Sequence, residues 1–294
     1  MTVSVVVSAF NSEKKIGACL KSSSFADEII VVNNSSTDKT LEIAKKYTSN
    51  IFNRKNNMML NVNKNFGFTK AKSDWILCLD SDEIVMPELA KEIKKVIQKS
   101  KIDGYWIPRK NIIFGKWIEH TGWYPDYQLR LIRNGKGKFP EKHVHEMIEV
   151  KGETRKLKGH LLHYNYDDVL QFLRKLEIYV ESESKNLIAD GYKLRAEDAV
   201  GFPFREFLSR FFAREGYRDG LHGLVLSLLM AFYHLCVFVR IWEKQKFKEI
   251  PVDTISLIKD QEKVVKKDFK YWIKNERMKL VKNPINKILI KLLE

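Results

Sequence analysis

Cysteine is scarce in this chain of 294 residues. The sequence contains Cys19, Cys78 and Cys236, which are too widely spaced for a disulfide framework or a Cys-x-x-Cys metal motif. We therefore expect a reducing, cytoplasmic environment. The N-terminus lacks a basic segment followed by a long apolar run, so we also expect no signal peptide.

Negative charge is in short supply as well. The chain has 52 Lys and Arg against 37 Asp and Glu, which gives a net charge of +15. Such an excess indicates an anionic partner, which could be a nucleotide, a nucleic acid or an anionic membrane surface. The apolar content of 44% is ordinary for a globular protein. The length allows one large domain, or a domain with a sizeable appendage.

In this basic chain, three carboxylates directly follow one apolar segment. Residues 75–79 are Trp-Ile-Leu-Cys-Leu, and Asp80, Ser81, Asp82 and Glu83 follow. An unbroken apolar run is typical of a parallel strand buried on both faces. Like charges at its end repel one another, and a bound Mg²⁺ or Mn²⁺ would remove that penalty. Ligands of open α/β sheets bind at such strand ends, so the segment predicts a metal-binding Asp-x-Asp that holds a nucleotide diphosphate. The alternative is a solvated loop before a helix that begins near Pro87.

The first 80 residues alternate between strand and helix patterns. Apolar, β-branched runs predict strands at 3–7, 28–32, 51–52 and 75–79. Helical spacing predicts helices over 12–20, 41–47 and 65–71. This alternation is typical of a doubly wound parallel sheet. The polar loop 33–38 opens the helix at 41, whose N-terminal amides favour an anion.

Three of these segments resemble the inverting glycosyltransferases of family 2. They are Ser4–Asn11, Asp27–Thr40 and Trp75–Glu83, and they occur in the family's order and spacing through about residue 165. The resemblance implies a GT-A fold, with a Rossmann-like nucleotide-binding half and a mixed-sheet acceptor half. It also implies a divalent cation, Mn²⁺ or Mg²⁺, held by Asp82, and a UDP-hexose as donor. The implied donor-binding residues are Ala9, Phe10, Asn11, Asn33, Asp38, Lys64, Asn65, Asp80 and Ser81, with Glu83 as a further candidate. Asn33 departs from the family, which usually has an Asp there that contacts the base, so the base remains open.

From Gly104 the pattern becomes antiparallel. Strand signals occur at 105–107, 112–114 and 128–133, and Asn134-Gly135 is a hairpin turn. Residues 123–130 resemble the acceptor-side segment of the family branch that adds glucose to the lipopolysaccharide inner core. That resemblance makes Asp126 the general base for the acceptor hydroxyl, while metal and basic groups stabilise the leaving diphosphate. It adds Gln128 and Arg130 as site candidates. The alternative for Asp126 is a turn residue after Pro125.

A pair of histidines comes next in the chain. His143 and His145 share one face of a strand, which suits metal ligation or contact with an anion. The continuation is His-Glu-x-x-Glu, so the second histidine of a zinc-protease motif is missing. The family resemblance places His145 near the metal and Glu146 in the site. It leaves His120, His143, His160 and His163 open.

The rest of the chain is predicted to be helical. Residues 169–188 form an amphipathic pattern that we assign to packing. Residues 221–239 carry no formal charge and reach the length of a membrane span, although basic residues flank both ends, so an interfacial or buried helix remains open. From Arg240 onward, 15 Lys and Arg stand against 8 Asp and Glu. This tail predicts a basic amphipathic helix that binds an anionic membrane surface or packs on a neighbour, with a second short helix after Pro284. Its apolar face comprises Ile258, Val265, Phe269, Trp272, Ile273 and Leu280.

We therefore predict an α/β GT-A catalytic domain over 1–166, a helical region over 167–249 and basic amphipathic helices over 250–294. The predicted function is metal-dependent, inverting transfer of a hexose from UDP-glucose or a similar nucleotide sugar to a lipid-linked or lipopolysaccharide-core saccharide. The predicted location is the cytoplasmic side of the inner membrane. Direct transfer to a polyprenyl phosphate and a non-catalytic membrane scaffold are the alternatives. Nucleic-acid binding is disfavoured because the basic excess lies on an amphipathic tail. The oligomeric state, including a homo-oligomer, is left open.

Overall fold

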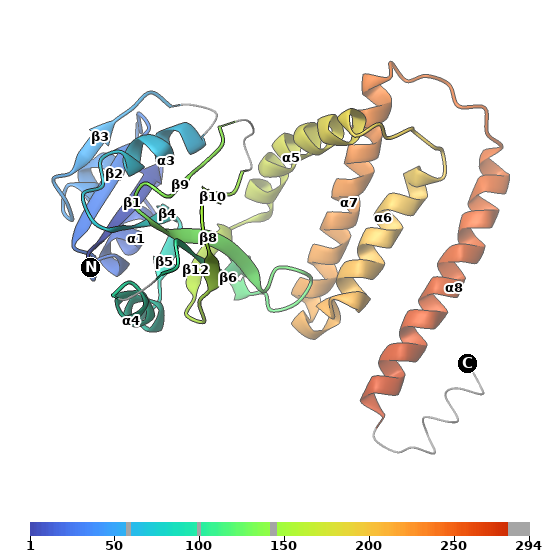
Figure 1. Cartoon of the computed structure of the whole chain (residues 1–294). Coiled ribbons are helices and arrows are strands. Elements are labelled where there is room, and N and C mark those ends of the chain that lie inside the picture. Colours follow the sequence, from blue (N-terminus) through green and yellow to red (C-terminus); the bar gives the residue numbers. More distant parts are fainter. Residues whose placement is uncertain (57–59, 99–100, 142–145, 282–294) are drawn as a thin grey trace. The chain divides into compact units, whose positions relative to one another are not determined.

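The computed structural model describes residues 1–56, 60–98, 101–141 and 146–281 (Figure 1). The chain divides into two compact units. We call residues 1–117 and 124–165 the sheet unit. The helical unit consists of residues 118–123 together with the chain from 166 onward.

The first half of the sheet is parallel, as predicted. Its strands lie in the order β3 (Ile51–Asn53), β2 (Glu28–Asn33), β1 (Val3–Ala9) and β4 (Trp75–Asp80). The helices α1 (Ile16–Ser22), α2 (Thr40–Ala44), α3 (Leu60–Phe68) and α4 (Pro87–Val96) occur along the same part of the chain. Helix α1 begins later than predicted because residues from Ser12 form a turn. Helix α3 begins earlier than predicted, since polar Asn61, Asn63 and Lys64 occupy buried positions and hide its apolar spacing.

The second half of the sheet is largely antiparallel. Strand β8 (Asp126–Arg133) runs antiparallel to β4 on one side and to β6 (Gly104–Ile113) on the other. Beyond β6 the order continues through β12 (Leu161–Tyr166) to β5 (Glu83–Val85), and β7 (Lys116–Trp117) and β11 (Thr154–Lys156) also pair with β6. The two strands predicted at 105–107 and 112–114 form the single strand β6, because its polar middle continues the ladder. Strands β9 (Gly137–Lys138) and β10 (Glu149–Val150) form a separate pair.

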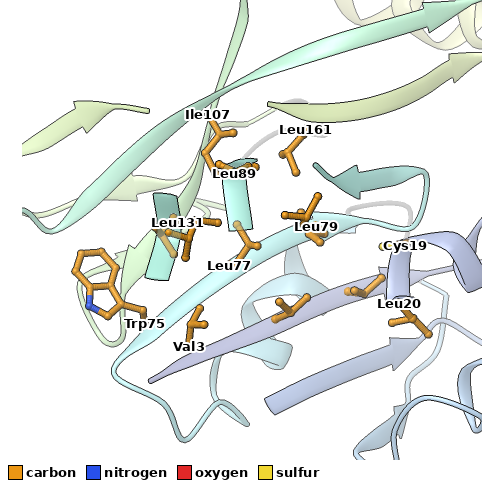
Figure 2. Close-up of a cluster of buried hydrophobic side chains, with 14 of the residues drawn as sticks. Val3, Cys19, Leu20, Trp75, Leu77, Leu79, Leu89, Ile107, Leu131 and Leu161 are labelled. Carbon is orange, nitrogen blue, oxygen red and sulfur yellow. The ribbon is translucent and has the colours of Figure 1, made fainter. Parts of the chain in front are cut away.

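One apolar core joins the two halves of the sheet (Figure 2). Leu77 and Leu79 of β4 are fully buried, and they belong to the same cluster as Leu89 of α4 and the antiparallel-strand residues Ile107 and Leu161. Each fully buried side chain of this size contributes about 1.5–3 kcal/mol. The shared core therefore holds the end of β4 in a fixed position relative to β6 and β8.

The helical unit contains α5 (Val169–Ala189), α6 (Asp198–Leu208), α7 (Leu221–Lys244) and α8 (Thr254–Leu280). A π-helical turn, Ser209–Ala213, continues α6, and a 3₁₀ turn, Gly216–Asp219, precedes α7. These elements confirm the predicted helices over 169–188 and 221–239 and the long basic helix. The short helix predicted after Pro284 lies outside the described residues.

Helices α7 and α8 differ in how their apolar residues are used. Within the described residues, α7 is the helix long and apolar enough to cross a membrane, with a mean hydropathy of 2.1 and 33% of its apolar window buried. Helix α8 packs inside its unit through aromatic rings: Phe269 lies 5.4 Å from Phe204, and Trp272 stacks on Phe212 at 6.0 Å. Part of the apolar face predicted for α8 is therefore covered.

Candidate active site

The polar loops predicted to act together meet at one edge of the sheet. The register of β1 pairs Ala9 with Asn33 of β2 and Ser8 with Asp80 of β4. The carboxyl ends of these three parallel strands are therefore adjacent. On the antiparallel side, Asp126 opens β8 and pairs with Arg109 of β6.

Asp80 is held by two cations from different elements. Lys64 of α3 places its Nζ 2.5 Å from Asp80 Oδ1, and Arg130 of β8 contacts Asp80 Oδ2. Burial alone would raise the pKa of Asp80, but the charges of Arg130 and Lys64 outweigh it and hold that pKa well below its usual range. Asp80 is therefore ionised, and the end of β4 carries an ion-paired carboxylate with two cations beside it.

Glu83 connects this pair to the antiparallel strands. Its side chain is fully buried, and its Oε1 lies 2.8 Å from Arg130 Nη2 and 3.2 Å from Arg109 Nη1. Its other oxygen accepts the backbone N–H of Asp80 at 2.9 Å. Because both arginines reach Glu83, the carboxylates at the two ends of the network are linked through one buried group.

Asp126 is fixed by three donors from the antiparallel strands. Arg109 contacts Asp126 Oδ2 through Nη2 at 2.6 Å and Nε at 2.8 Å, and Asn111 donates to the same oxygen at 3.1 Å. Gln128 donates to Oδ1 at 2.8 Å. Burial would raise the pKa of Asp126, but the charge of Arg109 and these hydrogen bonds lower it below its usual value. The carboxylate is therefore unprotonated at neutral pH.

Asp82 and His163 provide the donors that suit a cation. His163 Nε2 lies 3.7 Å from Asp82 Oδ2, and His163 Nδ1 lies 2.7 Å from Asn111 Oδ1. Since the Asn111 amide donates to Asp126, its oxygen accepts from His163 Nδ1–H, which leaves Nε2 as the ring nitrogen that faces Asp82. A carboxylate oxygen and an imidazole nitrogen so arranged fit two ligands of one Mn²⁺ or Mg²⁺ ion.

The remaining ligands of such an ion are not defined by the described residues. No group of three or more His, Cys, Asp or Glu side chains with metal-binding geometry occurs among them. His145, the predicted second ligand, lies in the segment 142–145, outside the described residues.

Other predicted donor-binding residues shape the loops at the sheet edge. Asn33 Nδ2 donates to Asn53 Oδ1 at 2.9 Å, and Asn33 Oδ1 accepts the N–H of Ser36 at 3.3 Å. Asn11 adopts a left-handed conformation (φ 44°), and its Oδ1 accepts the N–H of Thr37 at 2.9 Å. These amides therefore fix the turn that follows β2.

The further candidates Phe10, Ser81 and Asp38 lie in the same loops. Phe10 is 42% exposed, next to buried Ala9 at the end of β1. Ser81 Oγ lies 2.8 Å from Ser12 Oγ. Asp38 accepts the N–H of Glu13 and of Thr40, each at 3.0 Å, at the start of α2. Both oxygens of the Asp38 carboxylate therefore accept hydrogen bonds from the local backbone.

Asn65 and Glu146 are not brought into the charge network by the described contacts. Asn65 exchanges two hydrogen bonds with the backbone of Phe139, both at 2.9 Å. Glu146 accepts from Asn61 Nδ2 at 3.3 Å and from the N–H of Glu141 at 2.7 Å. Both side chains fix the chain on either side of the segment 142–145.

Sequence reasoning missed Arg109 and Asn111 and left His163 open. The available signal was the polar middle of β6, in which Arg109 and Asn111 are two positions apart and therefore lie on one face. That signal locates a polar patch, but it does not identify the side chains that Arg109 and Asn111 contact. The buried amide chain from Ser8 through Asn34 to Asn63 was also missed, because isolated asparagines give no pattern.

A carboxylate-lined edge of parallel strands, joined to an antiparallel half, is the arrangement predicted for a GT-A glycosyltransferase. The sequence profile described as glycosyl transferase family 2 matches residues 4–149. The chain therefore carries a family 2 glycosyltransferase domain with the predicted fold, and the protein is a glycosyltransferase.

Several individual proteins are similar to this chain over most of its length. The lipopolysaccharide core biosynthesis glycosyltransferase LpsC of Rhizobium meliloti is 24% identical over 258 residues, which cover 85% of this chain and 96% of LpsC. An uncharacterized glycosyltransferase of Rickettsia typhi is 26% identical over 243 residues, covering 78% of this chain and 83% of the relative. Among solved structures, Staphylococcus aureus TarS 1–349 in complex with UDP-GlcNAc has a TM-score of 0.45 at 16% identity, covering 86% of this chain and 94% of that one.

Proposed function

We propose that the protein is a metal-dependent, inverting glycosyltransferase that moves a hexose from a UDP-sugar to a saccharide acceptor, with Asp126 as general base. The observation that carries the proposal is the placement of Asp126. It opens the acceptor-side strand β8 and is linked through Arg109 and Glu83 to Asp80 at the nucleotide-side edge. Two ionised carboxylates, one on each side of a site, suit a reaction that deprotonates an acceptor and expels a diphosphate.

The hydrogen bonds of Asp126 suit the role of a base. Its Oδ2 is occupied by Arg109 and Asn111, whereas Oδ1 accepts from Gln128, and a carboxylate oxygen can accept a second donor. An acceptor hydroxyl hydrogen-bonded to Oδ1 would lose its proton as the oxygen attacks the anomeric carbon. Attack from the face opposite the leaving diphosphate inverts the configuration at that carbon.

The nucleotide side offers charge that suits a diphosphate. Lys64 and Arg130 lie against Asp80, and Asp82 with His163 would hold a divalent cation. The cation, when bound, would supply positive charge to the diphosphate oxygens. Lys64 and Arg130 would contribute further positive charge to the developing UDP anion, because preorganised cations stabilise negative charge without reorganisation.

Asn33 supports uridine as the base. The N–H of Ser36 can act only as a donor, so the contact with it fixes Asn33 Oδ1 as the oxygen, and Nδ2 is held by Asn53. The amide oxygen can accept a second hydrogen bond, as the carboxylate usual in the family would. Uracil offers an N–H donor at its ring edge, and we infer that Asn33 accepts it.

We further propose a saccharide of the lipopolysaccharide core, or another lipid-linked saccharide, as acceptor, bound by the enzyme at the cytoplasmic face of the inner membrane. The likeness to LpsC over most of both chains supports the acceptor class. Helix α7 exposes Leu221, Leu228, Phe232 and Val239, whose spacing places them on one face. An apolar face on a chain of net charge +15 suits an anionic bilayer.

The catalytic part is tested by donor hydrolysis. UDP-, GDP- and TDP-sugars are incubated with Mn²⁺ or Mg²⁺ and the wild-type enzyme, Asp82→Ala or Asp126→Asn. We expect turnover of one UDP-hexose that disappears with a chelator and in Asp82→Ala, and that falls by about 10²–10⁴-fold in Asp126→Asn. A direct titration of UDP on the same samples separates a strictly acceptor-dependent enzyme from an inactive fold. Absence of both UDP binding and turnover in the wild type would overturn the proposal.

The membrane part is tested by sedimentation with vesicles. We expect binding to vesicles that contain phosphatidylglycerol, and weak binding to phosphatidylcholine alone. The variant Leu228→Asp/Phe232→Asp should lose this binding. Lys263→Gln on α8 should weaken it by only about fivefold, because one exposed lysine contributes about 1 kcal/mol at an anionic surface. Equal sedimentation of wild type and the double variant would contradict the assignment.

A further inference from the structure

The loop that leads into Asp126 belongs to the helical unit rather than to the sheet. The chain leaves the sheet unit after Trp117, passes through residues 118–123, and returns at Tyr124. Within this loop, Ile118 and Thr121 are fully buried. Only Tyr124 and Pro125 separate the end of the loop from Asp126.

One buried carboxylate accepts hydrogen bonds from several polar groups of this loop. Asp219, which is 4% exposed, ends the 3₁₀ turn before α7. Its Oδ2 accepts the N–H of His120 at 2.9 Å and the hydroxyl of Thr121 at 3.2 Å. Its Oδ1 accepts the N–H of Glu119 at 3.3 Å and lies 3.3 Å from His120 Nδ1. A single carboxylate thus fixes the direction of three successive residues.

The loop backbone is strained and depends on its surroundings. Thr121 and Gly122 both adopt left-handed conformations, with φ of 63° and 83°. A β-branched residue such as threonine is rarely found there, and it persists only where neighbouring contacts determine it. The contacts come from the turn after α6: Arg210 Nη1 donates to Thr121 O at 2.8 Å, and Thr121 N donates to Arg214 O at 3.0 Å.

The turn that carries Asp219 is itself tightly packed. Gly223, in the first turn of α7, lies so close to Gly216 that a Cβ there would be 1.7 Å from the Gly216 carbonyl oxygen and 3.1 Å from Asp219 Cβ. The start of α7 and the turn of Asp219 are therefore held together by close backbone contact. Asp219 has a fixed position from which to hold the loop.

We propose that Asp219 is a positioning residue for the reaction: by clamping residues 119–121 it fixes the chain that carries the general base Asp126. This inference rests on the proposed function. A base held in a productive geometry loses efficiency when it is displaced, and a misplacement of 1 Å can cost about 10²-fold in rate. The helical unit then has a part in catalysis in addition to any membrane contact.

The test uses the full chain and compares Asp219→Asn with Asp198→Asn. Asp198 is a matched control, because it is a fully buried carboxylate of the same unit whose partners are Arg195, Arg205 and Tyr192 and not the loop. Three quantities are measured: amide hydrogen exchange over 118–128, the rate of UDP-glucose hydrolysis with Mn²⁺, and the Kd for UDP.

We expect Asp219→Asn to accelerate exchange over 118–126 and to lower the hydrolysis rate by about 10²-fold, with the Kd for UDP unchanged. Asp198→Asn should change neither exchange in the loop nor the rate. Wild-type exchange and rate in Asp219→Asn, or the same loss in both variants, would overturn the inference.

Two further variants test the inference if Asp219→Asn does not fold and separate it from the proposed function. If Asp219→Asn does not fold, Thr121→Val removes one hydrogen bond to Asp219 while keeping the side-chain shape. It should shift exchange and rate in the same direction by less, and wild-type behaviour would overturn the clamp. Asp126→Asn separates the two proposals: undiminished hydrolysis there would overturn the proposed function itself. Loss in Asp126→Asn with wild-type hydrolysis in Asp219→Asn would overturn only the positioning role.

Discussion

Two fully buried carboxylates, Glu83 in the sheet unit and Asp198 in the helical unit, are neutralised in different ways. Asp198 accepts from Arg195 and Arg205, whose side chains are 58% and 59% exposed. Glu83 contacts Arg109 and Arg130, which are 15% and 6% exposed. Asp198 lies in the first turn of α6, where the helix dipole also favours a negative charge.

The arginines of the two units also differ in whether they contact a second carboxylate. Arg130 also contacts Asp80, and Arg109 also contacts Asp126, so each cation is shared between two carboxylates. At Asp198 the charge is balanced locally and near solvent. The same elementary ion pair thus stabilises a helix start in one unit and connects the two sides of a proposed active site in the other.

The largest difference between the two units is expected in the rate of UDP-hexose turnover, which should fall in Asp126→Asn. The amide keeps the shape of the side chain but cannot accept a proton, and general-base catalysis contributes about 10²–10⁴-fold. We expect the rate of UDP-hexose turnover to fall by that factor with UDP binding retained. Turnover and UDP binding are measured side by side in Asp198→Asn, where both should keep their wild-type values. A rate retained in Asp126→Asn would remove the base assignment.

The next effect concerns stability. Arg130→Met leaves Glu83 with Arg109 alone and Asp80 with Lys64 alone. Breaking a buried ion pair costs about 3–5 kcal/mol in unfolding free energy. Arg195→Met removes a largely exposed partner of Asp198, and such pairs contribute about 0–1 kcal/mol. Urea unfolding followed by tryptophan fluorescence measures both. Equal losses in the two variants would show that the shared cations confer no special stability.

A third carboxylate, Glu181 of the helical unit, gives the stability of the protein a dependence on pH. Hydrogen bonds from Lys244, Arg240 and Lys185 lower the pKa of Glu181 from the usual 4.5 to about 2. A depressed pKa in the folded state stabilises the protein above the unfolded value, so this contribution is present above pH 4.5 and is lost as the pH falls toward 2. Glu181 joins α5 to α7 at the surface, with distances of 2.8 Å to Arg240 Nε and 2.9 Å to Lys244 Nζ.

The measurement is the Tm of wild type and Glu181→Gln as a function of pH. We expect a small, constant difference above pH 5 that shrinks to zero toward pH 2, because an exposed pair contributes little and is screened by solvent. A difference that persists unchanged at low pH would contradict the assignment of this pKa shift.

The smallest effect is expected at the loop after β2, where we propose that Asn33 contacts the base. Asn53→Ala removes the acceptor that orients the Asn33 amide, and one neutral hydrogen bond contributes about 0.5–1.5 kcal/mol, or roughly 2–13-fold in affinity. We expect the Kd for UDP to rise within that range and the Kd for Mn²⁺ to stay constant. Unchanged UDP affinity would indicate that Asn33 does not contact the base.

Much of the sheet unit could be predicted from sequence because its signals are local. Apolar runs that end in polar residues gave the strands β1, β2 and β4, and the rule that such ends share one sheet edge brought Asn33 and Asp80 together. Strand alternation also located β8 over 128–133, two residues short of its start at Asp126, which the family resemblance singled out. The contacts among side chains could not be predicted, because Arg109, Asn111 and His163 come from strands whose register depends on the whole sheet.

The helical unit was predicted less completely. Apolar spacing found α5 and α7, but it gave no sign that residues 118–123 would fold with the helices, because that contact depends on one aspartate about a hundred positions away. Apolar spacing likewise put Phe269 and Trp272 on a face of α8 suited to lipid, whereas their rings pack on aromatic side chains of the same unit. Periodicity identifies an apolar face but not what covers it.

The most direct test of the account is a calorimetric titration of UDP with and without Mn²⁺ on the wild type, Asp82→Ala and Asp126→Asn. The account predicts that UDP binds the wild type and Asp126→Asn with the same affinity, that binding weakens strongly without Mn²⁺, and that Asp82→Ala loses the Mn²⁺-dependent part. Equal UDP affinity with and without Mn²⁺, or full Mn²⁺-dependent binding in Asp82→Ala, would contradict it.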